Sequence, residues 1–205
     1  MKSRIAPSLI LSALLFCAGA QANIIYSDNF SSDTPALNEA PSGWTIGNGG
    51  TVDIIAPVNE WGLKCESASS TCIDLDGSSY KSGLLSSPNM ALNQGDIYTV
   101  MFELAGNQRL NQTDIVTVTF GGATVILDLA ENAPWTTYSI SAIPTKNETT
   151  NLTFLDSSNN DVGALLGDVS VDPASAAIPE PGTCALLGLG LLVATLVRRK
   201  GISAR

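Results

Sequence analysis

The sequence predicts an all-β protein, a two-sheet antiparallel sandwich or jelly roll, on three observations. Short runs alternate apolar and polar side chains with a period of two, so that in residues 97–106 Tyr98, Val100 and Phe102 share one face. Turns rich in glycine, proline and asparagine separate the runs, and no run carries a helical stripe. About nine short strands divided in this way are typical of sandwiches and jelly rolls.

The chain begins with the features of a secretory signal peptide. Lys2 and Arg4 form a positive start, residues 9–18 are a short apolar segment, and Ala-Gln-Ala at 20–22 is a small-x-small cleavage site. We therefore predict that residues 1–22 are removed. The alternative is an uncleaved membrane anchor, but the apolar segment is short for a membrane span.

The predicted β-sandwich occupies residues 23–171. Its clearest strands lie at Cys72–Gly77, Ile97–Gly106, Asp114–Gly122, Ala123–Leu129, Trp135–Ile143, Asn151–Ser157 and Ala164–Val171. Gly121 and Gly122 tolerate positive φ, which predicts a tight hairpin around them. Residues 172–178 are small and featureless, and we expect a linker there.

The charge of the body limits its partners. Residues 23–178 hold eighteen acidic and four basic residues, a net charge of −14. Such a surface repels phosphate backbones, so nucleic-acid binding is excluded, whereas neutral sugars and cations are compatible partners.

The residue types that are missing limit the chemistry. The chain has no histidine, which excludes Ser-His-Asp and Cys-His catalysis and histidine-based metal sites. We expect no enzyme and no cofactor, and among metals only hard cations held by oxygen remain.

Two cysteines remain in the body after removal of the signal peptide. Cys65 and Cys72 lie in a stretch rich in glycine and serine, and export places them in an oxidising compartment, so we predict a disulfide. In the chain-entropy model a loop this short stabilises the fold by about 2–3 kcal/mol. Cys184 lies in the apolar tail, and the sequence suggests no role for it.

Two loops carry candidate ligand-binding residues. Asn59, Glu60 and Trp61 together offer an aromatic platform with hydrogen-bonding neighbours, which suits a sugar. The alternative is that Trp61 covers the core, as large aromatic residues often do, and we expect this role for it, as for Trp44 and Trp135. Asn107 and Arg109 lie in an amide-rich loop that could bind hydroxyl groups, or that is simply long and exposed.

Asp74 and Asp76 share one face of a predicted strand before a turn glycine, Gly77. They could bind a cation or sugar hydroxyls. The favoured interpretation is a strand end with solvated acids.

The last residues have three parts in a characteristic order. Pro179, Glu180 and Pro181 form a triplet, residues 183–197 carry no charge, and Arg198, Arg199 and Lys200 begin a basic end, residues 198–205. As a helix, the apolar part would span about 22 Å, against about 30 Å for a hydrocarbon core. The basic end would stay cytoplasmic, so the body would face outward.

Residues 179–205 resemble the PEP-CTERM sorting signal of Gram-negative bacteria. The resemblance implies that the short helix holds the chain in the inner membrane transiently, and that an exosortase-type protease cuts near the triplet. It also implies that the body reaches the cell surface or the extracellular matrix of a bacterium that makes exopolysaccharide. The alternative is a simple C-terminal anchor.

The body resembles the galactose-binding-like jelly-roll domains often found on such proteins. The resemblance rests on a series of short features in order, at Gly43-Trp44, Val52–Ile55, Trp61, Cys72–Gly77, Gly83-Leu84, Tyr98–Asn107, Trp135–Ser139, Leu152–Phe154 and Asp168–Val171. It implies a β-sandwich related to carbohydrate-binding modules.

The resemblance also raises a structural calcium ion as a candidate. Relatives often carry acidic residues where this chain has Ser31 and Gly167, and those places help to hold the ion. Asp28, Asp33 or Asp168 could substitute for them by a small shift, although calcium needs six to eight oxygen ligands.

These features together predict a non-catalytic, exported surface or matrix protein that interacts with exopolysaccharide. The alternatives are a purely structural matrix or envelope protein and, less expected, a glycan-cleaving enzyme. An exposed aromatic platform in a concave patch would favour the first, and three buried tryptophans would favour the second.

Overall fold

The computed structural model describes residues 24–66, 70–109 and 112–174. They belong to one compact unit, Ala22–Ala174. The predicted signal peptide, the sorting signal and the predicted linker beyond Ala174 lie outside the described residues.

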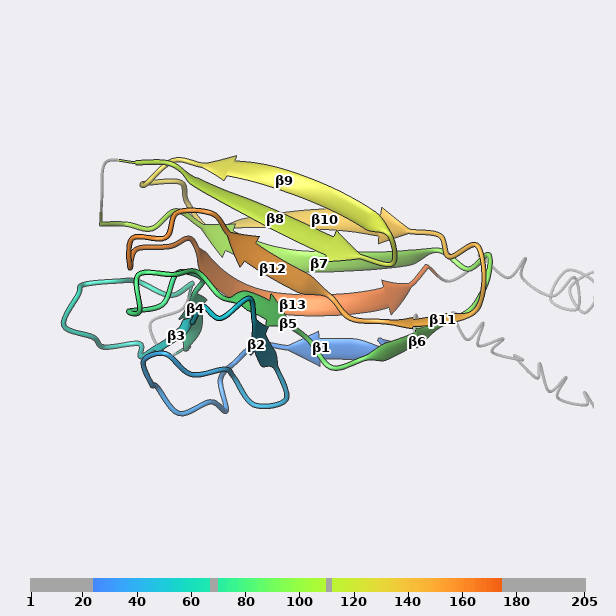
Figure 1. Cartoon of the computed structure of the whole chain (residues 1–205), viewed down its shortest axis with the longest axis horizontal. Coiled ribbons are helices and arrows are strands. Elements are labelled where there is room, and N and C mark those ends of the chain that lie inside the picture. Colours follow the sequence, from blue (N-terminus) through green and yellow to red (C-terminus); the bar gives the residue numbers. More distant parts are fainter. Residues whose placement is uncertain (1–23, 67–69, 110–111, 175–205) are drawn as a thin grey trace, which may run out of the picture. The chain divides into compact units, whose positions relative to one another are not determined.

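The described residues form thirteen strands and no helix (Figure 1). The strands are β1 (Tyr26–Asp28), β2 (Thr45–Gly47), β3 (Asp53–Ile55), β4 (Cys72–Asp74), β5 (Leu84–Ser86), β6 (Met90–Leu92), β7 (Tyr98–Ala105), β8 (Asp114–Phe120), β9 (Ala123–Leu129), β10 (Thr136–Ala142), β11 (Glu148–Thr150), β12 (Thr153–Asp156) and β13 (Leu165–Pro173). These described residues contain no helix that is long and apolar enough to cross a membrane.

The strands form two main sheets, which confirms the predicted sandwich. The first sheet has the order β10-β7-β13-β4-β3, with β1 also paired to β13, and the second has the order β2-β5-β12-β8-β9. A small third sheet joins β11 to β6, and the pairings are antiparallel. In Figure 1 β8 and β9 of the second sheet lie over β7 and β10 of the first.

The core fills the space between the sheets, and the period-two pattern explains why. In β7 the side chains of Val100, Phe102 and Leu104 are buried, while Met101 between them is exposed. Phe102 meets Phe154 of the second sheet edge to face, with ring centroids 5.4 Å apart. Each such side chain contributes about 1.5–3 kcal/mol when it is fully buried.

The hairpin around the two glycines is also as predicted. Phe120 pairs with Ala123 across it, and Gly121 and Gly122 have φ of 53° and 79°. A Cβ atom on Gly121 would lie 2.9 Å from the Cβ of Ala142, so a side chain there would be both strained and crowded.

Two expectations need correction. The sheets contain more strands than the nine or so predicted, because pieces of three residues such as β1, β2 and β3 are too short to show a period. In addition, β13 continues to Pro173, so Asp172 and Pro173 pair with β7 rather than start a linker.

Cys65 and Cys72 are joined by a disulfide, as predicted. Cys72 opens β4, and both cysteines pack with Ile55 and Leu63 in a small second core. The disulfide therefore fastens the loop after β3 to the first sheet.

Candidate functional site

The loop after β3 carries an exposed tryptophan above an apolar surface. Trp61 is 40% exposed, Val58 is 90% exposed and Leu37 is 44% exposed. With Pro35 and Glu60 these residues line a shallow hollow of about 270 Å³, which we call the apolar hollow. The prediction that Trp61 covers the core is therefore wrong.

The other two tryptophans pack inward to different degrees. Trp44 is buried among aromatic rings and donates its Nε1 hydrogen to Asp28, at 2.8 Å. Trp135 is only half-buried and donates to the Lys64 carbonyl oxygen at 3.0 Å. The structure therefore has one buried tryptophan and not three, and three buried tryptophans were the pattern expected of a purely structural protein.

Asn59 shapes the loop that presents Trp61. Its Nδ2 donates to the carbonyl oxygens of Ala56 and Leu63, both at 2.9 Å, and its Oδ1 accepts the Leu63 amide at 3.0 Å. Both amide hydrogens are thus used inside the loop. Of the three predicted residues, Glu60 and Trp61 face solvent, whereas Asn59 holds them in place.

The second predicted pair, Asn107 and Arg109, points into the protein. Asn107 is fully buried, donates to Asp114 at 2.8 Å and accepts the Arg109 amide at 2.9 Å. The Arg109 guanidinium forms an ion pair with Asp74 and donates to the Asp161 carbonyl oxygen at 3.3 Å. These side chains organise the loops and do not border the apolar hollow.

Gln108, which the sequence did not single out, connects the two loops. Its Nε2 donates to the Lys64 carbonyl oxygen and its Oε1 accepts the Lys64 amide, both at 2.9 Å. This pair of bonds braces the chain next to the disulfide, three residues after Trp61. The only signal in the sequence was the amide-rich composition of the loop.

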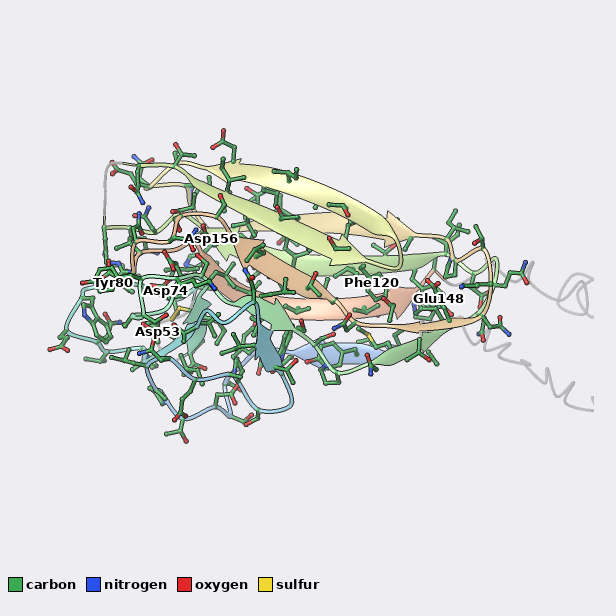
Figure 2. All side chains as sticks on the ribbon, in the orientation of Figure 1. Asp53, Asp74, Tyr80, Phe120, Glu148 and Asp156 are labelled. Atoms are coloured by element: carbon green, nitrogen blue, oxygen red, sulfur yellow. A yellow bond between two sulfur atoms is a disulfide. The ribbon has the colours of Figure 1, made fainter. Side chains whose placement is uncertain are left out.

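A second unexpected feature is a buried acidic cluster, which comprises Asp74, Asp76, Asp114 and Asp156. All four residues are at most 1% exposed. The expectation that Asp74 and Asp76 are solvated is therefore wrong. In Figure 2 Asp74 and Asp156 lie at one end of the unit, with Asp53 nearby, while Phe120 and Glu148 mark the other end.

The cluster is held by backbone amides and by one arginine. Asp76 accepts hydrogen bonds from the amides of Asn160 and Asp161, and Asp156 accepts the Ala164 amide at 2.9 Å. The Ser158 hydroxyl lies 2.7 Å from Asp156 Oδ1 and 3.2 Å from Asp76 Oδ2.

Burial raises the pKa values of three members of this cluster, Asp74, Asp114 and Asp156. Burial, followed by the charges of Asp156 and Asp76, raises the pKa of Asp114 to about 7. Burial also raises the pKa of Asp156. Burial raises the pKa of Asp74 well above its ordinary value even though the Arg109 charge lowers it.

The structure brings together two of the three aspartates suggested for calcium, since Asp28 and Asp168 line one hollow that Asp33 does not border. Asp28 accepts the Phe30 amide at 2.9 Å as well as the Trp44 indole, and Asp33 accepts the Ser42 amide at 2.8 Å. Asp168 also lies with Glu66 and Glu103, in a surface triad whose nearest oxygens lie within 4.8 Å of one another.

The surroundings of Gly167 explain why this chain lacks the acidic residue that relatives carry at that position. A Cβ atom there would lie 3.0 Å from Cζ3 of Trp135 and 3.4 Å from Cβ of Glu103, so an aspartate has little room. An aspartate at position 167 is therefore disfavoured, and a calcium ion near Asp28, Asp33 and Asp168 stays a prediction.

Burial is the first cause of the raised pKa values in the surface triad. It raises the pKa of Glu103, and the hydrogen bond and charge of Glu66 add to it. The pKa of Asp168 is raised by burial and then by Glu66 and Asp28. The triad is thus a place of like-charge repulsion.

Comparison with known proteins gives two results. Residues 177–200 match the family model described as the PEP-CTERM protein-sorting motif, which confirms the interpretation of the tail. The comparison with curated proteins found no match.

Solved structures show the fold of the body. The CBM22-1 xylan-binding domain of Paenibacillus barcinonensis Xyn10C is 14% identical with a TM-score of 0.52, and the match covers 78% of this chain and all of that domain. The CBM22-1-CBM22-2 tandem domain of the same protein is 16% identical with a TM-score of 0.51, and the match covers 82% of this chain and 50% of that one. At such identities the likeness shows a shared β-sandwich.

Proposed function

We propose that this chain, which carries a PEP-CTERM sorting motif and a β-sandwich like that of carbohydrate-binding modules, is an exported, non-catalytic protein that binds extracellular polysaccharide. The observation that carries the proposal is the exposure of Trp61 in the apolar hollow. The sorting motif supports export and processing by an exosortase-type protease, with the cell surface or the matrix as the destination.

The chemistry of the apolar hollow suits a sugar ring. A pyranose has an apolar face of C–H groups and a rim of hydroxyls, so it matches a site that combines an indole with a few polar groups. Trp61, Val58 and Leu37 supply exposed apolar area, and Glu60 supplies an acceptor for hydroxyls. The bonds of Asn59 and the nearby disulfide hold the loop in shape before a ligand arrives, which lowers the entropic cost of binding.

The charge of the body selects among polysaccharides. With a net charge of −14 in residues 23–178, the surface repels polyanions such as uronic-acid polymers at low salt. Neutral polysaccharide is therefore the ligand class that we expect.

The placement of the acids supports a role without catalysis. Glycoside hydrolysis requires two carboxylates that face each other across the scissile bond, at about 5–10 Å. Among the residues that the structure describes, Glu60 is the one acid that lines the apolar hollow, whereas Asp28, Glu103 and Asp168 line a separate hollow.

Polysaccharide sedimentation tests the proposal. The protein recovered from outside the cell is mixed with the producing bacterium's own exopolysaccharide, and the bound fraction is measured against polysaccharide concentration. We expect saturable binding that Trp61→Ala abolishes. Ile126→Ala is the matched control, because Ile126 is also exposed, at 66%, but lies on β9 of the second sheet.

Two results would contradict the proposal. Absence of saturable binding by the wild-type protein would favour a structural matrix protein without a specific ligand. Equal loss of binding in both variants would show that the polysaccharide binds nonspecifically to exposed apolar side chains rather than to the apolar hollow.

A further inference from the structure

Two carboxylate oxygens in the buried acidic cluster lack a hydrogen-bond partner. Asp76 and Asp114 are both 0% exposed, and Asp76 Oδ1 and Asp114 Oδ1 have no hydrogen-bond partner among the described residues. Burying an ionised oxygen without compensation is costly, and buried charges in proteins are ordinarily paired or coordinate metals. These two oxygens therefore point to a missing positive partner.

The other oxygens of Asp76, Asp114 and Asp156 do have hydrogen-bond donors, so the two unpartnered oxygens are the exceptions in the cluster. The Ser158 hydroxyl lies within hydrogen-bonding distance of both Asp76 and Asp156, but it has one hydrogen and can serve only one of them at a time. Asp114 receives the side-chain amide of Asn107 on its other oxygen, Oδ2.

The protein's own cations do not neutralise the group. Within the described residues the contact between Arg109 and Asp74 is the single ion pair. None of the described Lys or Arg side chains forms an ion pair with Asp76, Asp114 or Asp156, which are closed to water.

The three residues come from both sheets. Asp76 follows β4 of the first sheet, Asp114 opens β8 of the second, and Asp156 ends β12, in register with Val116 on β8. Residues on the same strand alternate between faces, so Asp114 and Asp156 point to the same, inner side of their sheet as Val116.

We propose that Asp76, Asp114 and Asp156 bind one hard divalent cation of the calcium class inside this end of the sandwich. Carboxylate oxygens are the ligands that such ions prefer, and extracellular modules bind calcium at concentrations of about 0.1–1 mM. The site differs from the place implied by the resemblance, near Asp28, Asp33 and Asp168.

Binding requires a small closure of the cluster. Among the described residues, Glu66, Glu103 and Asp168 are the one group of three acids whose oxygens lie within 4.8 Å of one another. The carboxylates of Asp76, Asp114 and Asp156 do not all lie within this distance of one another, so side-chain rotation about the ion has to bring them together. The ion would then cross-link the two sheets.

The experiment measures calcium binding and thermal stability together. The protein recovered from outside the cell is purified, stripped with EDTA and dialysed, and then titrated with calcium chloride by calorimetry. We expect one bound calcium per chain and a rise in melting temperature of at least about 5 °C at saturating calcium, because binding to the folded state alone stabilises it.

Isosteric variants locate the ion. Asp114→Asn, and separately Asp76→Asn, should weaken calcium binding roughly tenfold or more, since affinity follows the number of charged ligands. In EDTA both variants should melt no lower than the wild type, because a neutral amide replaces an uncompensated charge. Asp168→Asn, in the surface triad, is the matched control and should keep the bound calcium.

The proposal requires that the Asp114 and Asp76 variants lose a calcium that the Asp168 variant retains. Any other pattern overturns it. No calcium-dependent change in the wild type would mean that the cluster holds no ion, and loss of binding in the Asp168 variant would place the ion in the surface triad.

Discussion

Single residues whose environment the sequence did not reveal dominate the chemistry of this protein. Trp61 and Trp44 look alike in the sequence, yet one is exposed and the other is buried. Asp74 and Asp76 looked like solvated acids, but loops from distant parts of the chain cover them, as the contacts with Asn160 and Gly163 show. Burial of this kind depends on contacts that span some ninety residues, so no local pattern reports it.

At the same scale, the surface triad makes stability depend on pH. The pKa values of Glu103 and Asp168 are raised in the folded state, so these acids release their protons more readily when the chain unfolds. Their contribution to stability therefore falls as the pH rises from about 4, the unfolded value, towards neutrality.

Glu66→Gln should relieve this effect. We expect the variant to be more stable than the wild type at pH 7, by a few tenths of a kcal/mol because solvent screens exposed charges, and equal to it near pH 3. Urea denaturation at both values measures the difference, and Glu39→Gln, on another exposed loop, is the control. A Glu66 variant that is no more stable at pH 7 than at pH 3, relative to the wild type, would contradict the prediction.

Among the elements, the long strands could be predicted and the short ones could not. The strands β7, β8, β9 and β10 each have at least seven residues and show a clear period of two. The three-residue strands are defined by their partners, as β2 is by its pairing with β5. A partner far along the chain cannot be inferred from the sequence of three residues.

Removal of the disulfide tests how the loop after β3 contributes to both stability and binding. A Cys65→Ser, Cys72→Ser double variant should lose about 2–3 kcal/mol in the free energy of unfolding, because the unfolded chain regains loop entropy. It should also bind polysaccharide more weakly, since the disulfide anchors the loop that bears Trp61.

Denaturant unfolding and the sedimentation assay measure these two effects. Cys184→Ser, in the tail beyond the described residues, is the control and should change neither. Unchanged stability of the double variant would mean that the packing of Ile55 and Leu63 holds the loop without the bond.

For the whole molecule, the all-β sandwich and the tail were accessible from sequence because both rest on local order. Alternation along a strand and the sequence of triplet, apolar run and basic end are each contained in a few dozen residues. The candidate site was accessible only in part, since the sequence named Glu60 and Trp61 but gave Asn107 and Arg109 a surface role that their buried contacts do not support.

Processing of the tail is a prediction for the whole chain. Mass spectrometry of the protein recovered outside the cell should show a C-terminus near Pro179–Pro181, because the motif at 177–200 marks the chain for sorting. Replacing Pro179, Glu180 and Pro181 by alanine should keep the tail attached. An intact Arg205 on the secreted wild-type protein would instead indicate a simple anchor.

The pairing of β1 with β13 has a mechanical consequence. Tyr26 lies beside Val171, so the first and last strands of the unit are neighbours, and Figure 1 shows β13 running away from the end that carries the loop after β3. If the protein is attached through its last residues while a polymer pulls at Trp61, the tension runs along β13. Its hydrogen bonds to β1, β7 and β4 lie across that direction, so they share the force and must shear together instead of opening one at a time.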